Sequence, residues 1–290
     1  MTTRSKPKRQ VGRHLERLLR QRFGLEEFRP GQEEVIRNVL DGIDTLAVMP
    51  TGAGKSLCYQ LPSLLLPGTT VVVSPLIALM NDQAEKLNGN GISSLRVNST
   101  LSAGDHADAL AHIAEGGSEI VFFTPEQLQT AAVIKRLRGI VIDLLVIDEA
   151  HCISDWGHDF RPAYLEIGNV LKQLGNPPVL ALTATAPERV IEDIKRQLGR
   201  PAIEVVNGSM YRRNLRYGVT QLSSESEKHA ALEKILMRVR GSRIVYTATI
   251  QAAESLYERL LRVGHPALLY HGRLGARRRL ENQQRFMVEK

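Results

Sequence analysis

Cysteine, tryptophan and long apolar runs are all scarce in this chain of 290 residues. Its two cysteines, Cys58 and Cys152, are too few for a disulfide framework and argue against a zinc site. No apolar run reaches the ~18–20 residues of a membrane-spanning helix, and the basic N-terminus lacks the apolar stretch of a secretory signal. The 43% apolar content excludes a disordered chain. We therefore expect a soluble, globular protein of a reducing compartment with no membrane partner.

Charge is unevenly distributed along the chain, although the formal net charge is only +7. Residues 1–22 are strongly basic, residues 23–199 are acidic, and residues 200–290 are again basic. Basic segments on both sides of an acidic middle favour a polyanionic partner. A solubilising tail and a solvated basic face explain the same charges equally well, so charge alone leaves both interpretations open.

Short apolar runs rich in valine and isoleucine alternate with helical patterns in most of the chain. Strands are predicted at residues 46–49, 71–74, 120–123, 144–147 and 179–182. Helices are predicted at residues 14–23, 55–61, 78–87, 104–115 and 187–198. Strands that are apolar throughout and separated by helices are typical of a parallel, doubly wound sheet with both faces covered. We therefore expect an α/β fold.

The pattern starts again near residue 207. Strands are predicted at residues 215–219, 244–246 and 267–270, with helices near 228–239 and 252–263. This second run is shorter than the ~100–200 residues usual for a domain. We therefore divide the chain into a basic tail with a short helix (1–22), a first α/β domain (23–206) and an incomplete second one (207–290).

The strongest local motif connects the first predicted strand to a helix. It consists of Met49, Pro50, Thr51, Gly52, Ala53, Gly54, Lys55 and Ser56. Backbone N–H groups of such a turn converge and can hold phosphate oxygens, while Lys55 reaches the outer phosphates and Ser56 ligates Mg²⁺. Met49 stands where the strict pattern has glycine, which favours the helicase variant of the loop. A glycine-rich turn of purely structural purpose is the alternative.

A second cluster follows the predicted strand at residues 144–147. Asp148, Glu149 and His151 emerge at its carboxyl end, where open α/β sheets bind their ligands. Asp148 can hold Mg²⁺, and Glu149 can orient and deprotonate an attacking water. An isolated Asp-Glu pair is more often a solvated strand end. Its pairing with the phosphate loop instead predicts a nucleoside triphosphatase site.

Together these motifs resemble those of superfamily 2 helicases, and in closer detail those of the RecQ DNA helicases. The resemblance covers residues 23 to about 286. Its motifs lie at residues 28–33, 72–80, 82–83, 124–126, 148–151, 153–162 and 183–185, and those of the second lobe begin at residues 244–247 and 270–274. It implies a RecA-like fold, ATP and Mg²⁺ as cofactors, and a bacterial cytoplasmic location. It also implies 3′–5′ DNA unwinding in recombination and repair, with single-stranded and forked DNA as partners. It also implies that Gln32 and Arg29 read adenine. The residues that it implies for single-strand contact are Ser74, Pro75 and Leu76.

Residues 153–162 resemble the aromatic-rich loop that marks this family among its relatives. The loop contains Trp156, the only tryptophan of the chain, together with His158, Phe160 and Arg161. Exposed rings can stack on unpaired bases and arginine attracts phosphates, so we expect the loop to bind single-stranded DNA. Such binding would also shift Glu149 and His151. A tryptophan anchored in a core is the alternative, which the polar flanking residues disfavour.

The chain departs from the family pattern in two respects. Leu25 stands where many relatives have an aromatic ring against the adenine. The later second-lobe motifs, which include an arginine finger worth roughly 10³–10⁵ in rate, do not occur among these residues. We therefore expect the chain to bind ATP and DNA but to hydrolyse ATP slowly. The alternatives are a catalytically silent binding fragment and an RNA helicase of the same superfamily, which His151 disfavours.

Overall fold

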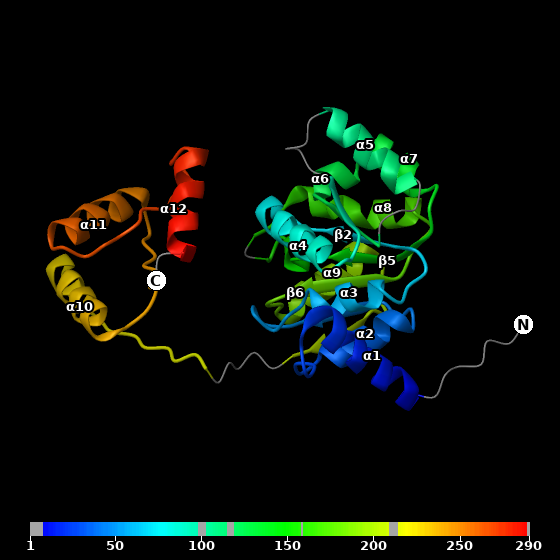
Figure 1. The fold of residues 1–290 in the computed structure, drawn as a ribbon, viewed down its shortest axis with the longest axis horizontal. Coiled ribbons are helices and arrows are strands. Elements are labelled where there is room, and N and C mark those ends of the chain that lie inside the picture. The colour runs from blue at the N-terminus through cyan, green and yellow to red at the C-terminus, as the bar shows by residue number, and fades with distance from the viewer. Residues whose placement is uncertain (1–7, 98–102, 115–118, 158, 209–213, 289–290) are drawn as a thin grey trace, which may run out of the picture. The chain divides into compact units, whose positions relative to one another are not determined.

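The computed structural model describes residues 8–97, 103–114, 119–157, 159–208 and 214–288. The chain forms two compact units, Met1–Asn214 and Leu215–Lys290, and each is described by itself (Figure 1). In the part of the chain that the structure describes, every helix is too short or too polar to span a lipid bilayer.

The first unit is built on a seven-stranded sheet whose strand pairs are all parallel. The strands are β1 (Thr45–Val48), β2 (Thr69–Val73), β3 (Ser94–Val97), β4 (Ile120–Phe123), β5 (Ile142–Ile147), β6 (Val179–Thr183) and β7 (Glu204–Asn207). Their spatial order is β3-β4-β2-β5-β6-β1-β7, so the expected doubly wound α/β fold is confirmed. All five strands predicted in this unit form. The two unpredicted strands, β3 and β7, lie at the sheet edges, where polar residues interrupt the apolar run.

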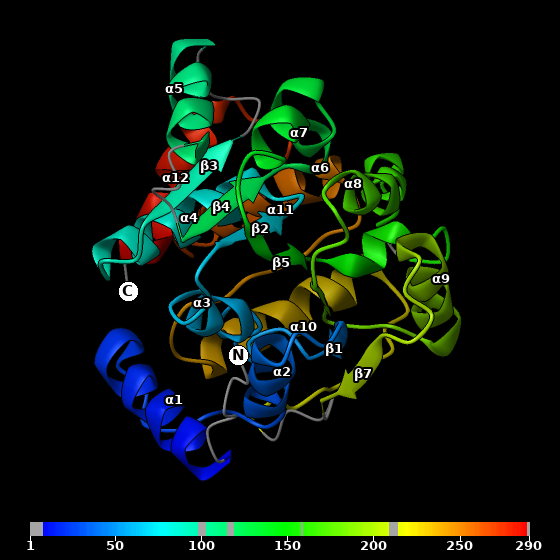
Figure 2. The same ribbon diagram turned by 90° about the vertical axis from the view of Figure 1, so that its right-hand side faces the viewer.

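Helices cover both faces of the sheet, as Figure 2 shows from the side. They are α1 (Lys8–Phe23), α2 (Gln32–Leu40), α3 (Leu57–Ser63), α4 (Ile77–Gly89), α5 (Ala103–Ala114), α6 (Pro125–Leu128), α7 (Ala131–Leu137), α8 (Ile167–Gln173) and α9 (Glu188–Leu198), with 3₁₀ turns at Ala150–Ile153 and Pro162–Glu166. Ala47 and Val146 pack with α2, α3 and α4, whereas Leu46 and Leu145 pack with α7, α8 and α9. Because successive strand residues point to opposite faces, the central strands are apolar at most positions.

Helix α1 belongs to the packed part of the first unit. It starts at Lys8 rather than at the predicted residue 14. Its Leu15 and Leu19 side chains are fully buried, in a small cluster that also contains Ile36, Leu57 and Leu61. The opposite side of the helix carries the exposed side chains of Arg13, Arg17 and Arg20. The basic segment is therefore anchored to α2 and α3 through its apolar face.

The second unit contains α10 (Glu225–Arg238), α11 (Ile250–Arg262) and α12 (Ala276–Val288). The helices predicted near residues 228–239 and 252–263 are confirmed as α10 and α11. The three strands predicted in this unit are wrong, since residues 215–219, 244–246 and 267–270 form no strand. Val219 and Tyr246 are 99% and 89% exposed. A strand needs a paired neighbour and an apolar layer against its face, and none of the described side chains of residues 214–288 is buried.

Truncation of Leu19 tests whether α1 stabilises the first unit. We expect Leu19→Ala to lower the free energy of unfolding by about 2–5 kcal/mol, because a buried leucine side chain leaves a cavity when it is removed. Chemical denaturation followed by circular dichroism measures the change. Leu25→Ala is the matched control, because Leu25 follows the same helix but is 41% exposed. An equal effect of the two substitutions would show that α1 adds nothing to the core.

Candidate active site

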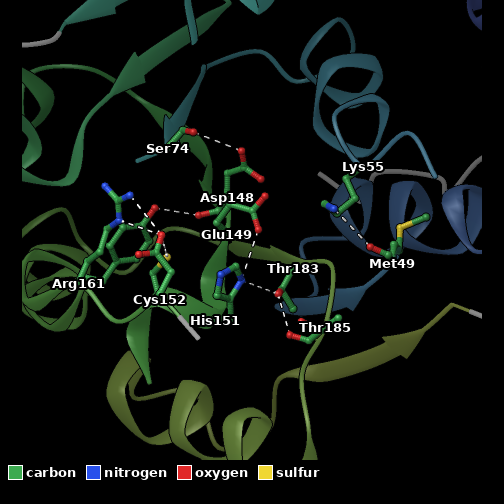
Figure 3. Close-up of polar contacts among 12 residues, drawn as sticks. Met49, Lys55, Ser74, Asp148, Glu149, His151, Cys152, Arg161, Thr183 and Thr185 are labelled. Atoms are coloured by element: carbon green, nitrogen blue, oxygen red, sulfur yellow. Dashed lines mark hydrogen bonds and ion pairs between the residues drawn. The ribbon is translucent and has the colours of Figure 1, made fainter. Parts of the chain in front are cut away.

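Four strands, β2, β5, β6 and β1, are neighbours in the middle of the sheet. Their carboxyl ends lie side by side, and we call this side of the sheet the carboxyl edge. Two main-chain hydrogen bonds continue the sheet there, from Asp148 N to Val73 O and from Met49 N to Thr183 O, each 2.9 Å long. Ser74, Asp148 and the loop after Met49 are therefore brought together, although they lie far apart in the sequence (Figure 3). Open α/β sheets bind their ligands outside such strand ends.

Residues 50–56 connect β1 to α3, as predicted, and expose a stretch of backbone. Gly52 and Gly54 have left-handed backbone conformations, with φ of 82° and 79°, which glycine adopts without steric cost. Lys55 Nζ donates a hydrogen bond of 3.4 Å to Met49 O, at the end of the strand. The residues of the loop that are exposed or half-buried are Thr51, Gly52, Ala53, Gly54, Lys55 and Ser56. The loop is therefore open to a ligand while its lysine is held beside it.

Gln32 and Arg29 brace this loop. The buried Gln32 amide donates to the carbonyls of Ala53 and Gly54, each over 3.0 Å, and its Oε1 accepts a hydrogen bond of 2.8 Å from Arg29 N. The Arg29 guanidinium donates to Gly52 O. A Cβ atom at Gly54 would lie 2.6 Å from Gln32 Nε2, so glycine leaves room for this amide. The resemblance assigns Gln32 and Arg29 to adenine. In the structure both side chains lie against the loop of residues 50–56 and hold its backbone.

Asp148 is a nearly buried carboxylate at the end of β5, with 8% of the residue exposed. It accepts a hydrogen bond of 3.3 Å from Ser74 Oγ. Burial, and to a lesser extent the charge of Glu149, raises the pKa of Asp148 to about 6. A carboxylate whose charge is so poorly compensated is suited to a divalent cation. Such a cation would take its other ligands from Ser56, phosphate and water, since the described residues hold no cluster of three metal-ligating side chains.

Glu149, His151 and Thr183 lie against one another where β5 and β6 end (Figure 3). Glu149 has a left-handed backbone, with φ of 50°, which is uncommon for a residue with a side chain. Its Oε2 lies 3.3 Å from His151 Nδ1, and this nitrogen lies 3.0 Å from Thr183 Oγ1. Thr183 Oγ1 donates to Thr185 O over 3.1 Å, so it accepts the proton of His151 Nδ1. The imidazole is thereby oriented toward the carboxylate.

Two residues, Tyr164 and Gln83, contact the site in ways that the sequence does not predict. The buried Tyr164 donates from its hydroxyl to Asp148 O over 2.9 Å, immediately after the aromatic-rich loop. Gln83 belongs to the stretch that resembles a single-strand contact, yet its Nε2 donates to Ser56 Oγ over 3.2 Å and its Oε1 accepts from Tyr59. Neither contact follows from sequence spacing, because both partners come from other elements.

The aromatic-rich loop presents its rings to solvent. Trp156 and Phe160 are 62% and 37% exposed, so the alternative of a tryptophan anchored in a core is wrong. Arg161 pairs with Asp159 at 3.2 Å and donates from Nη1 to Pro75 O over 3.4 Å. The loop is thus tied to the segment of the predicted single-strand contacts Ser74, Pro75 and Leu76, of which Leu76 is exposed and Ser74 is buried against Asp148. His158 lies outside the described residues.

The two cysteines lie within the motifs but are not placed for chemistry. Cys58 and Cys152 are both buried. Burial raises the pKa of each thiol to about 12, which keeps it protonated and poorly nucleophilic at neutral pH. Both side chains are therefore packing groups of the core.

The raised pKa of Asp148 predicts a stability effect that depends on pH. A raised carboxyl pKa lowers the stability of the folded state as the pH rises from about 4 to about 6, and the loss persists above that range. We expect Asp148→Asn to raise the melting temperature of the protein without nucleotide or Mg²⁺ at about pH 8, and the gain to shrink toward about pH 5, where Asp148 is protonated. Differential scanning fluorimetry measures both values. The control is Asp82→Asn at an exposed position of α4, and equal shifts of the two variants at every pH would contradict the assignment.

Comparison with known proteins identifies relatives of this chain. Residues 29–194 match the DEAD/DEAH box helicase family. The chain is 43% identical over 272 residues to the ATP-dependent DNA helicase RecQ of Bacillus subtilis, with 93% of this chain and 46% of the relative covered. It is 40% identical over 276 residues to the probable ATP-dependent DNA helicase RecS of the same organism, with coverage of 94% and 55%. The chain therefore spans about half the length of these relatives.

Two solved structures share the fold. The helicase Lhr of Mycobacterium smegmatis, bound to single-stranded DNA and AMP-PNP, has a TM-score of 0.67 at 21% identity, covering 92% of this chain and 39% of that chain. The DUF1998 helicase MrfA has a TM-score of 0.67 at 19% identity, with coverage of 95% and 44%. At these identities the likeness concerns the fold alone, and the first unit has the RecA-like architecture of a helicase lobe.

Proposed function

Because the chain belongs to the DEAD/DEAH box helicase family and is related to RecQ DNA helicases, we propose that it is the motor portion of an ATP-dependent 3′–5′ DNA helicase of the RecQ type. The proposal rests on one observation above all. The phosphate loop, Asp148 and Glu149 meet at a single sheet edge, which main-chain hydrogen bonds hold together. The proposed cofactors are ATP and Mg²⁺, and the proposed partner is single-stranded or forked DNA.

ATP binding is proposed to use the loop of residues 50–56. Its backbone N–H groups and Lys55 neutralise the phosphate oxygens. Ser56 and Asp148 hold Mg²⁺, which when bound polarises the phosphate groups and offsets their charge. The burial of Asp148 supports this assignment, because it raises the pKa of the carboxyl and a bound cation would offset the cost of its buried charge. Gln32 and Arg29 are proposed to contact adenine, for which Gln32 exchanges one of its two donated loop hydrogen bonds for the base.

Hydrolysis is proposed to use Glu149 as the base. A water oxygen attacks the γ-phosphorus, the bond from that phosphorus to the bridging oxygen of ADP breaks, and the water proton passes to the Glu149 carboxylate. His151, which Thr183 holds by a hydrogen bond, lies against this carboxylate where β5 and β6 end. The base is thereby kept at a fixed orientation, which a proton acceptor requires.

Coupling of DNA binding to hydrolysis is proposed to pass through the aromatic-rich loop. Trp156 and Phe160 are exposed for stacking on unpaired bases, and Arg161 links them to Pro75. The residues on either side of this short loop, His151 before it and Tyr164 after it, both contact the end of β5 that carries Asp148 and Glu149. If the loop moves when it binds a DNA strand, that movement would therefore displace the carboxylates of Asp148 and Glu149.

The 290-residue chain by itself is proposed to hydrolyse ATP slowly. The resemblance implies a second lobe that closes over the nucleotide and supplies an arginine finger worth roughly 10³–10⁵ in rate. Over residues 214–288, as far as they are described, no strand forms and no side chain is buried. The second unit therefore lacks the packed sheet of such a lobe. A silent binding fragment is the alternative, and the measurement below separates the two.

Substitution of Glu149 tests the chemistry. We expect the wild-type chain to bind ATP and hydrolyse it slowly, and Glu149→Gln to reduce turnover by about 10²-fold or more, because an amide accepts no proton. ATP affinity should stay within about threefold, since the amide keeps the shape of the carboxylate. A fluorescent ATP analogue reports binding. Phosphate release at high protein concentration, with and without single-stranded DNA, reports turnover.

The outcomes of this experiment are distinct. Lys55→Ala should weaken ATP binding itself and serves as the control for loss of the nucleotide. Equal turnover of Glu149→Gln and wild type would contradict the role of Glu149, and an absence of ATP binding would contradict the proposed function. Turnover stimulated as well by RNA as by DNA would favour the RNA helicase alternative.

The exposed arginines of α1 are proposed to contact DNA phosphates. Deletion of residues 1–22 would also remove Leu15 and Leu19 from the core, so substitution is the cleaner test. We expect the combined change of Arg13, Arg17 and Arg20 to glutamine to make the plot of log affinity for single-stranded DNA against log salt shallower by up to about 2, because each phosphate contact contributes about 0.7. Fluorescence anisotropy over a salt series measures this slope.

A matched variant controls for the loss of three charges. It carries glutamine at the exposed Lys135, Arg136 and Lys172, on α7 and α8, and its salt dependence should equal that of the wild type. An unchanged slope in the α1 variant would contradict a role of this helix in binding DNA.

A further inference from the structure

Trp156 is covered on one side of its ring by a cation that the proposed function does not use. The guanidinium carbon of Arg189 lies over the ring, 5.0 Å from its centroid. Trp156 is nevertheless 62% exposed, so the rest of the ring faces solvent. Arg189 is exposed in the first turn of α9, outside the phosphate loop, the aromatic-rich loop and the other motifs of the resemblance. The contact therefore adds an unassigned side chain to the proposed DNA-binding surface.

Helix α9 also holds the backbone of the aromatic-rich loop. Ser154 Oγ donates to Asp193 Oδ2 over 2.7 Å, and these two residues are only 1% and 8% exposed. Trp156 N donates to the same Ser154 Oγ over 3.2 Å. Arg189 and Asp193 are four residues apart and therefore lie on one face of α9. This face fixes the start of the loop through Asp193 and the indole ring through Arg189.

The chemistry of the pair suits a stacking platform. A cation is attracted to the electron-rich face of an aromatic ring, and a planar guanidinium covers one face without blocking the other. A base that stacks on a mobile ring must first order it, and that ordering reduces affinity. A ring already held by Arg189 avoids this cost. The guanidinium also keeps a positive charge next to the ring, which attracts the phosphates of the same strand.

We propose that Arg189 is a positioning residue of the single-strand binding surface, which holds the Trp156 ring so that its open side can stack on an unpaired base. This inference rests on the proposed function, because it requires the aromatic-rich loop to bind single-stranded DNA. It adds a residue of α9 to that surface. It also joins the surface to the helix that follows Thr183 and Thr185 in the chain.

The only tryptophan of the chain provides a direct readout. In the full 290-residue chain, Arg189→Ala should change the intensity and emission maximum of Trp156 fluorescence before DNA is added. Affinity for a labelled oligothymidine, measured by anisotropy at low salt, should fall about 3- to 10-fold. Arg189→Lys should restore part of this loss, because it keeps the charge without the planar group. Arg136→Ala removes an exposed cation from α7 and should change neither quantity.

A double-mutant cycle with Trp156→Ala separates the inference from the proposed function. If Arg189 acts through the ring, Arg189→Ala should change affinity less than about twofold in the Trp156→Ala background. A full effect of Arg189→Ala in that background would overturn the inference. Oligothymidine binding by Arg189→Ala as tight as that of the wild type, or tighter, would overturn it as well. Binding that Trp156→Ala leaves unchanged would instead overturn the proposed function of the loop.

Discussion

The parallel pairing of β2, β5, β6 and β1 is the constraint on which the candidate site depends. Because these strands run in the same direction and in register, their carboxyl ends meet at one edge. Hydrogen bonds from Asp148 N to Val73 O and from Met49 N to Thr183 O extend this pairing to the first site residues. The distances between phosphate loop, carboxylates and threonines are thus set by main-chain geometry rather than by flexible side chains.

That edge is not arranged for maximal stability. The pKa of Asp148 is raised because its charge is buried beside Glu149. The left-handed backbone of Glu149 costs on the order of 1–3 kcal/mol at a residue with a side chain. Such features persist only where the surrounding structure fixes them, and here they directly follow four buried residues of β5. The two apolar cores therefore allow a strained and charged site to remain in place, which suits the proposed binding of a cation and phosphates.

The aromatic-rich loop is held from three directions, which relates the DNA-binding proposal to the nucleotide site. Arg161 connects it to Pro75 after β2, Tyr164 connects its end to Asp148, and Ser154 connects its start to Asp193 on α9. A loop with so many attachments cannot move without changing its neighbours. This arrangement supports a loop that transmits the presence of DNA rather than one that only adds affinity.

The sequence by itself determined the α/β fold of the first unit and most of the candidate site, because these depend on local signals. The central strands can be recognised in the sequence because both of their faces are buried, which makes them apolar runs. The phosphate loop can be recognised because its glycines and lysine are adjacent in the sequence. Only the tertiary structure decided the contacts of Tyr164, Gln83 and Arg189, because each has its partner on another element. It also decided that Val219 and Tyr246, strand-like in sequence, stay exposed. Strand formation depends on a paired neighbour and a covering layer, and no short stretch of sequence contains that information.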